Sequence, residues 1–229
     1  MTKPNTSAED RPYHHGDLQR AIVSAALEVL SETQSTEFSL RELARRAGVS
    51  HNAPYKHFAE KRVLLGAVSA VGFQLLAKRI TDATERLSNP RARLAAIARA
   101  YVRQGVENPA LYRLMFGGYL TSPDDGRPAI ERAAAEQTKD LLAGAIIDGA
   151  LGRPIANTAR NERKLASAIL IFWSQMHGLT LLLVDGLVGP SAKADELSES
   201  VLQGMLDGLA TRIPAIPAGT WIGPPAPAK

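Results

Sequence analysis

The chain contains 229 residues, of which 45% are hydrophobic and 22% are charged, and its formal net charge is +4. This length suits one compact body or a small domain joined to a larger one, and the apolar fraction is sufficient for a core, so the composition argues against wholesale disorder. The absence of cysteine excludes disulfides, thiolate nucleophiles and cysteine-based metal sites. The mild excess of positive charge is compatible with an anionic partner.

The N-terminal segment, residues 1–12, is polar and lacks the apolar stretch of a secretory signal, so we predict a flexible arm. The sequence also lacks an uninterrupted apolar run long enough to span a bilayer, because the longest candidate, residues 169–188, contains Gln175, His177 and Asp185. We therefore expect a soluble, cytoplasmic protein.

The first predicted helix starts at Gly16 or Asp17 and ends near Thr33, with apolar residues repeating along one face. It follows His14 and His15 directly. Two adjacent histidines suggest a metal ion, but no third ligand follows at a usable spacing, so we predict no metal site. The alternatives for this pair are a simple lead-in to the helix and an arm that reaches a phosphate or a nucleic-acid groove.

Residues 38–61 predict two short helices joined by a tight turn. Ser39 is placed to cap the first helix, and the glutamate three residues later completes a capping box. Gly48 follows the last helical residue, where a left-handed backbone needs no Cβ. Ser50 can cap the second helix, with Pro54 still near its first turn. This pattern is a helix-turn-helix, whose second helix normally enters the major groove of DNA.

Positive charge is concentrated in the same stretch. Between Arg41 and Arg62 six side chains are basic and two are acidic, so this segment carries as large an excess as the whole chain. A solvated helix face is the ordinary explanation for any single arginine on a helix. For the group we favour contact with phosphates, because a helix-turn-helix lies beneath it.

The remainder of the chain predicts further helices, and we therefore expect an all-α fold. Their predicted ranges are 60–87, 91–106, 109–116, 129–151, 161–187 and 195–211. Residues 121–128 predict an exposed loop, and the proline-rich tail, residues 213–229, predicts an extended segment. The last two helices have broad apolar faces, which either fill an internal core or pack against a partner.

The stretch from Leu40 to Ser50, followed by Tyr55-Lys56-His57-Phe58 and Lys61, resembles the tetracycline-repressor (TetR) family. The resemblance implies a three-helix DNA-binding head at residues 13–60 and a larger helical body at residues 61–212 that binds a ligand and forms a homodimer. It implies the following DNA-binding side chains: Arg41, Ser50, His51, Asn52, Ala53, Tyr55, Lys56, His57 and Lys61. Pro54 departs from the family's usual Leu or Ile, which indicates that the second helix starts late or sits differently.

The chemistry of several of these side chains suits DNA. Asn52 can bond adenine through two hydrogen bonds, Ala53 can meet a thymine methyl group, and His51 can donate to guanine or to a phosphate. The resemblance places Tyr55 against the DNA backbone and Lys61 on a phosphate. Core packing remains the alternative for Tyr55.

A second constellation, Trp173-Ser-Gln-Met-His177-Gly178, puts an indole and an imidazole on one helical face. It resembles the Trp-His-Gly type of C-terminal domain in the same family, as does the stretch 108–117. We predict an apolar ligand site lined by Tyr101, Tyr112, Met115, Phe116, Trp173 and His177. A satisfied core histidine is the alternative for His177.

These features predict a sequence-specific DNA-binding regulator, most simply a repressor that a small hydrophobic or aromatic effector releases from a palindromic operator. One alternative is a regulator whose body binds a protein partner instead of a small molecule. The other is an enzyme, which we do not favour because the sequence contains no nucleophile elbow, phosphate-cradling loop or zinc-protease motif. No cofactor is implied.

Overall fold

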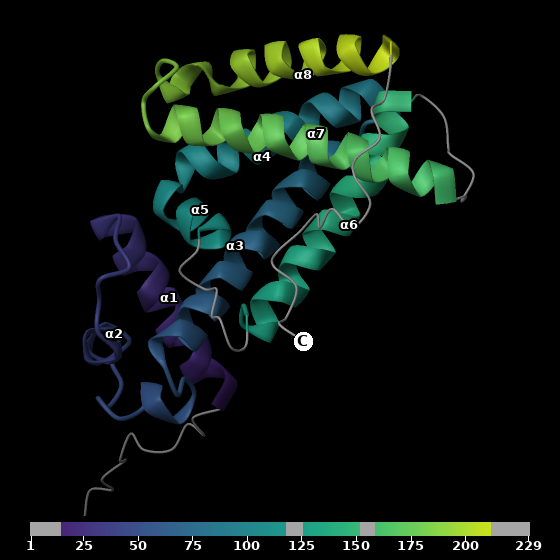
Figure 1. The fold of residues 1–229 in the computed structure, drawn as a ribbon. Coiled ribbons are helices and arrows are strands. Elements are labelled where there is room, and N and C mark those ends of the chain that lie inside the picture. Colours follow the sequence, from purple (N-terminus) through teal and green to yellow (C-terminus); the bar gives the residue numbers. More distant parts are fainter. Residues whose placement is uncertain (1–14, 118–125, 152–158, 212–229) are drawn as a thin grey trace, which may run out of the picture. The chain divides into compact units, whose positions relative to one another are not determined.

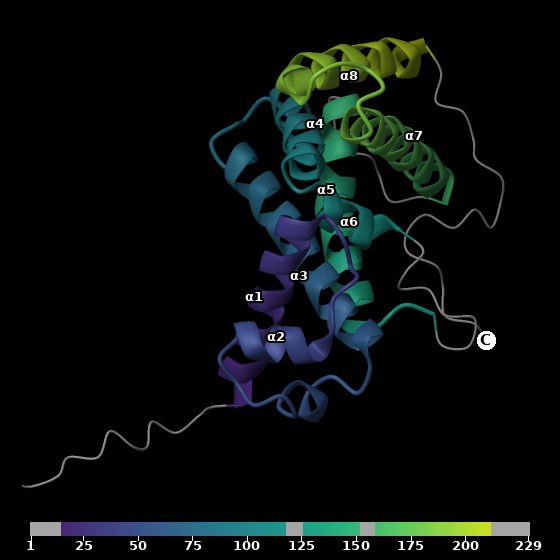
Figure 2. The same ribbon diagram turned by 90° about the vertical axis from the view of Figure 1, so that its left-hand side faces the viewer.

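The computed structural model describes residues 15–117, 126–151 and 159–211, and every regular element in these ranges is a helix (Figure 1, Figure 2). The predicted all-α fold is therefore confirmed. The predicted arm at residues 1–12 and the predicted tail at residues 213–229 lie outside the described residues, as does most of the predicted loop.

The chain divides into two compact units, residues 1–64 and residues 65–229, with the boundary inside one helix. The first unit contains α1 (His15–Thr33), α2 (Leu40–Arg46), a 3-10 turn (Pro54–Lys56) and the first residues of α3 (Lys61–Thr84). Its core includes side chains that are at most 2% exposed, namely Ile22, Ala26, Val29, Leu30, Leu43, Ala44, Phe58 and Leu64.

The predicted second helix of the helix-turn-helix is wrong in form, because the structure has only the 3-10 turn there. Pro54 lacks the backbone N–H that would bond to Ser50 in an α-helix. The amide of Ala53 instead bonds to the Ser50 carbonyl at 2.9 Å, which is the tighter three-residue spacing. Ser50 is also not the cap of this element: the residue that precedes it is Ala53, which offers no side-chain bond.

The second unit holds α3 from Leu65 onward and five further helices. They are α4 (Pro90–Glu107), α5 (Pro109–Phe116), α6 (Ala129–Leu151), α7 (Ala159–Val184) and α8 (Ala194–Thr211), all within a few residues of the predicted ranges. Helix α4 packs against α6, α7 and α8, and Figure 1 shows α8 running along α7 and α4. The α4 helix is therefore the centre of this body.

Local chemistry explains where α4 begins and how closely it packs. The Asn89 side chain accepts a hydrogen bond from the Ala92 amide at 3.0 Å, and Pro90 occupies the first helical position, where no N–H is needed. A Cβ added at Gly105 would lie 2.1 Å from Cγ2 of Thr180, so glycine is what lets α4 and α7 approach.

Helix α3 fits against α5 and α6 through two more glycines. A Cβ at Gly66 would lie 2.6 Å from the ring of Pro128, and one at Gly72 would lie 2.6 Å from Sδ of Met115. Two apolar side chains of this helix lie outside the core, since Val63 is 36% and Leu75 is 44% exposed.

By length and composition alone, α3 and residues 166–184 of α7 could each cross a membrane, but core helices of soluble proteins pass the same test. Our expectation for residues 169–188 treated single polar residues as interruptions, whereas mean hydropathy tolerates them. In α3, 61% of the apolar window is buried, as in a core helix. In α7 only 39% is buried, so this helix keeps apolar surface open.

Candidate functional site

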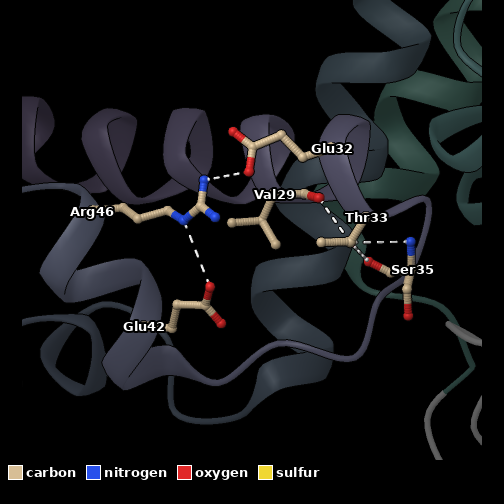
Figure 3. A network of polar contacts seen from close by, with 6 residues as sticks. All are labelled: Val29, Glu32, Thr33, Ser35, Glu42 and Arg46. Carbon is tan, nitrogen blue, oxygen red and sulfur yellow. Dashed lines mark hydrogen bonds and ion pairs between the residues drawn. The ribbon is translucent and has the colours of Figure 1, made fainter.

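Helix α2 is fixed at both ends by interactions that its sequence specifies. At its start, Ser39 Oγ accepts a hydrogen bond from the Glu42 amide at 3.1 Å, which confirms the predicted cap. Near its end, the Arg46 guanidinium lies between two carboxylates, 2.7 Å from Glu32 of α1 and 3.6 Å from Glu42, as Figure 3 shows. The ion pair between Arg46 and Glu32 joins α2 to α1, and it leaves Arg41 and Arg45 exposed.

The turn after α2 has the predicted left-handed residue. Gly48 has φ of +67°, and the amide of Val49 bonds back to the Ala44 carbonyl at 2.9 Å. This is the usual hydrogen-bond closure of a helix end at glycine. It sets the direction in which the chain leaves α2 and enters the segment that follows.

The segment after the turn presents a polar surface on an apolar base. Ser50, His51, Asn52 and Lys56 are exposed, and Tyr55 is 52% exposed. The base of the segment is buried and consists of Ala53, Pro54 and Phe58. Since Ala53 is only 7% exposed, packing is the better account of its methyl group than contact with thymine.

Lys61, the first residue of α3, contacts an aromatic ring in the same unit. Its Nζ lies 5.1 Å from the centre of the Phe38 ring, a cation–π contact, and Phe38 itself is 6% exposed. His57 is half-buried just before it. The predicted DNA-binding side chains thus fall into an exposed set and a smaller packed set within this unit.

In the second unit, the predicted aromatic residues form one cluster. Phe116, at the end of α5, lies between the other rings: its centroid is 4.8 Å from Tyr112, 4.9 Å from His177, 6.1 Å from Tyr101 and 6.3 Å from Trp173. Tyr101 and Tyr112 are each 1% exposed, whereas Phe116, Trp173 and His177 are half-buried. Met115, which precedes Phe116 in α5, is fully buried.

The sequence did not single out one further ring. Phe73 of α3 lies edge-on to Phe116 at 5.4 Å. Its position on the apolar face of a long helix is the only signal for it in the sequence, and that signal does not distinguish it from ordinary core.

Hydrogen bonds connect the polar atoms of the cluster. Trp173 Nε1 donates to the Tyr101 hydroxyl at 3.0 Å, the Tyr112 hydroxyl lies 3.2 Å from that of Tyr101, and Tyr112 also bonds to Nδ1 of His177 at 2.6 Å. Desolvation by burial raises the pKa of both tyrosines and lowers the pKa of His177. The cluster is therefore uncharged near neutral pH.

A buried ion pair holds the end of α5 close by. The Arg127 guanidinium donates to the carbonyls of Met115 at 2.8 Å and Gly117 at 2.7 Å, and to the Glu131 carboxylate at 2.5 Å. Glu131 is 0% exposed, and Ser69 of α3 donates to it at 3.5 Å. Burial raises the pKa of Glu131 against the opposing effect of Arg127. The four-residue spacing of the pair was visible in the sequence, but its burial was not.

Comparison with known proteins covers both units. Residues 22–68 match the family model described as bacterial regulatory proteins of the tetR family, and residues 94–205 match a tetracyclin repressor-like C-terminal domain. A transcriptional repressor of the helix-turn-helix type from Mycobacterium tuberculosis is 30% identical over 118 residues, which are 52% of this chain. The match spans 57% of that relative, and a regulator from Mycobacterium bovis matches to the same extent.

Solved structures share the fold over most of the chain. A protein with unknown function from Rhodococcus sp. RHA1 is 31% identical, with a TM-score of 0.69, over 87% of this chain and 98% of its own. A tetR-family transcriptional regulator from Streptomyces coelicolor is 19% identical, with a TM-score of 0.65, over 86% of this chain and 82% of its own. A bacterial regulatory protein of the tetR family from Rhodococcus RHA1 is 22% identical, with a TM-score of 0.57, over 81% of this chain and 95% of its own.

Proposed function

Because this chain belongs to the TetR family of transcriptional regulators, we propose that it is a repressor that binds a palindromic operator as a dimer and releases it when its body binds a small apolar or aromatic effector. Such a regulator acts where DNA is, in the cytoplasm. The relatives that the chain matches are transcriptional regulators, so a binding function is a better account of the body than catalysis.

One observation carries the DNA-binding part of the proposal. The segment after Gly48 exposes His51, Asn52 and Tyr55 together, while Ala53 and Pro54 hold it against the core. Exposed side chains that can bond base edges, on a rigid base, are what reading a major groove requires. Arg41, Lys56 and Lys61 supply positive charge for phosphates beside them.

The open apolar surface of α7 and α8 supports the dimer. Leu182 is 40% exposed on α7, and in α8 nothing lies within 4 Å of a Cβ added at Gly204 or Gly208. Open space at the Cβ positions of two glycines on an apolar helix would allow a second helix to approach closely. Two copies joined by these helices would present two heads to half-sites about 34–36 Å apart.

The aromatic cluster supports the effector. It is uncharged, mainly apolar and carries only a few polar atoms, as small-molecule sites do. Release would be a population shift in which the effector binds better to an arrangement of the dimer that does not fit DNA. At equilibrium the effector must weaken DNA binding by the same factor by which DNA weakens effector binding.

The test is binding to DNA from immediately upstream of the coding region against a scrambled fragment of equal length, over a salt series. A preference that survives near physiological salt, with two protomers per site, supports the proposal. Equal and steeply salt-sensitive binding to both fragments would reduce it to nonspecific phosphate contact at this site.

A further inference from the structure

We propose that Phe116 is an internal occupant of the effector site, and that the effector is an uncharged aromatic molecule with a hydrogen-bond acceptor that takes the place of this ring. The inference rests on the proposed function, since it names the ligand class of the same cluster. Its basis is the packing of one side chain and the number of protons in the hydrogen-bonded chain around it.

Phe116 is placed as a ligand would be. Among the described rings of the cluster it alone contacts all the others, which come from α3, α4, α5 and α7: Phe73, Tyr101, Tyr112, Trp173 and His177. The contacts are tilted or edge-on, which are the favourable geometries for aromatic pairs. A planar ligand of one ring would keep these contacts if it replaced Phe116.

The site also has a route for exchange. Its floor, Tyr101 and Tyr112, is 1% exposed, whereas Phe116 is half-buried and therefore reaches solvent. Phe116 is the last residue of α5, and Gly117 follows it in extended backbone. A ring at a helix end can leave its place with fewer lost backbone bonds than one in the middle of a helix.

The polar atoms of the cluster favour a ligand that accepts a hydrogen bond. Trp173, Tyr101, Tyr112 and a neutral His177 bring four N–H and O–H protons, but three contacts join them. Whatever the direction of each bond, one proton has no acceptor within these four groups. A carbonyl or ether oxygen of a ligand could accept this proton, and a hydrogen bond that is shielded from water is stabilising.

Charge argues against an acid as the ligand. Arg127, the one buried cation among the described residues, already holds Glu131 at 2.5 Å, and the exposed Arg113 of α5 holds Asp185 at 2.5 Å. A carboxylate in the cluster would be a buried charge without a partner among the described contacts of these rings, which is unfavourable. An aromatic ketone, aldehyde or ester satisfies both conditions.

The experiment compares Phe116→Ala with the wild type by calorimetric titration with acetophenone, ethylbenzene and benzoate. Removal of a large buried side chain can leave an apolar cavity that binds a benzene-sized molecule. We expect Phe116→Ala to bind acetophenone about tenfold more tightly than the wild type, because no side chain must be displaced. We expect it to prefer acetophenone over ethylbenzene by roughly 2- to 10-fold, the worth of one hydrogen bond, and to bind benzoate most weakly.

Two further variants keep the test decisive. Phe172→Ala removes an equally large side chain, 1% exposed, from α7, and should bind both neutral probes without preferring acetophenone. Phe116→Leu, which keeps most of the volume, should give a smaller gain than Phe116→Ala and serves if that variant does not fold. Folding of each variant is checked by its thermal unfolding curve.

Two results would overturn the inference. One is equal or tighter binding of acetophenone by the wild type, which would make Phe116 a wall of the site. The other is no aromatic binding by either folded Phe116 variant. Both outcomes are independent of DNA binding by the wild type. If the protein binds its operator but its Phe116 variants bind no aromatic molecule, only this inference is wrong and the proposed function stands. If acetophenone binds but DNA affinity is unchanged at saturation, only the proposed release of DNA by the effector is wrong.

Discussion

Lys61, which we propose as a phosphate contact, shows how one side chain can be ordered before an anion binds. Its ammonium lies over the Phe38 ring at 5.1 Å, which restricts a long flexible side chain to one region at the start of α3. Because fewer rotamers remain to be lost, binding an anion there costs less conformational entropy. The aromatic face leaves the ammonium's other donors available.

We therefore expect Lys61→Ala to weaken binding to all DNA sequences by a similar factor. The slope of the logarithm of affinity against the logarithm of salt concentration should fall in magnitude by about 1. The measurement is DNA affinity at several salt concentrations, for operator and scrambled fragments. Lys193→Ala, in the exposed 3-10 turn before α8, is the matched control and should change neither quantity. A loss confined to the operator would instead indicate that Lys61 reads bases.

His177 gives a prediction about pH. Burial lowers its pKa in the folded protein below the ordinary value of about 6.5, so the unfolded chain takes up a proton at higher pH than the folded one. The contribution of His177 to stability is therefore present above that ordinary value and is lost as pH falls through the lowered pKa.

His177→Gln should accordingly show a smaller loss of stability between about pH 7.5 and pH 5 than the wild type. The quantity to measure is the urea midpoint at each pH. His51→Gln, at an exposed histidine of the first unit, provides the comparison and should follow the wild type. Parallel wild-type and His177→Gln curves would contradict the prediction.

At the scale of helices, the elements with strong local signals were predictable. Ser39, Gly48 and Asn89 each act at a helix end through their own backbone chemistry, so the sequence locates those ends. The form of the second helix of the helix-turn-helix was not predictable. The effect of Pro54 depends on whether the first helical turn still forms when one N–H is missing. Here the apolar base of Ala53, Pro54 and Phe58 holds a 3-10 turn instead.

Most members of the aromatic cluster were predictable from the sequence, but Phe73 and the arrangement of the rings were not. Trp173 and His177 share a helical face, which follows from their spacing alone. That Phe116 lies in the centre, and that Phe73 closes one side, depends on the packing of α3 against α5. Contacts of this kind join residues far apart in the sequence, and no local pattern encodes them.

The close approach of α4 to α7 also permits a test by a single methyl group. Gly105→Ala would place a Cβ 2.1 Å from the buried side chain of Thr180. Overpacking of this kind costs about 1–3 kcal/mol, more than the roughly 1 kcal/mol that alanine gains over glycine in a helix. We expect a lower unfolding midpoint in urea.

The control for this substitution is Gly144→Ala in α6, where nothing lies within 4 Å of the added Cβ. With no clash, the helix propensity of alanine should raise the unfolding free energy by up to about 1 kcal/mol. Opposite shifts for the two glycines support the packing argument, whereas equal shifts would show that α4 and α7 can separate without loss.

In the whole molecule, α3 is the covalent connection between the two units, since their boundary falls between Leu64 and Leu65. Met115 fits into the gap at Gly72 of this helix, and Arg127 holds the end of α5 while its partner Glu131 contacts Ser69 of α3. Phe116 is the last residue of α5, and α5 packs against α3. A ligand that displaces Phe116 would therefore act next to the helix that connects the two units.

In the proposed mechanism such a displacement acts on two heads that are held together in a dimer, so the dimer can be tested separately. Leu182 of α7 and Leu141 of α6 are both 40% exposed, which makes them a matched pair on different helices. A glutamate at position 182 would bury an unpaired charge between the proposed partner helices, and burial of such a charge is strongly unfavourable.

We expect Leu182→Glu to sediment as a monomer at concentrations where the wild type and Leu141→Glu are dimers. Its affinity for a palindromic operator should fall at least tenfold, because each half-site is then bound without the gain in effective concentration that a linked second head provides. Its affinity for a single half-site should stay unchanged, since the head is intact. A dimeric Leu182→Glu, or a monomeric Leu141→Glu, would move the interface away from α7 and with it the geometry by which the effector could change the spacing of the heads.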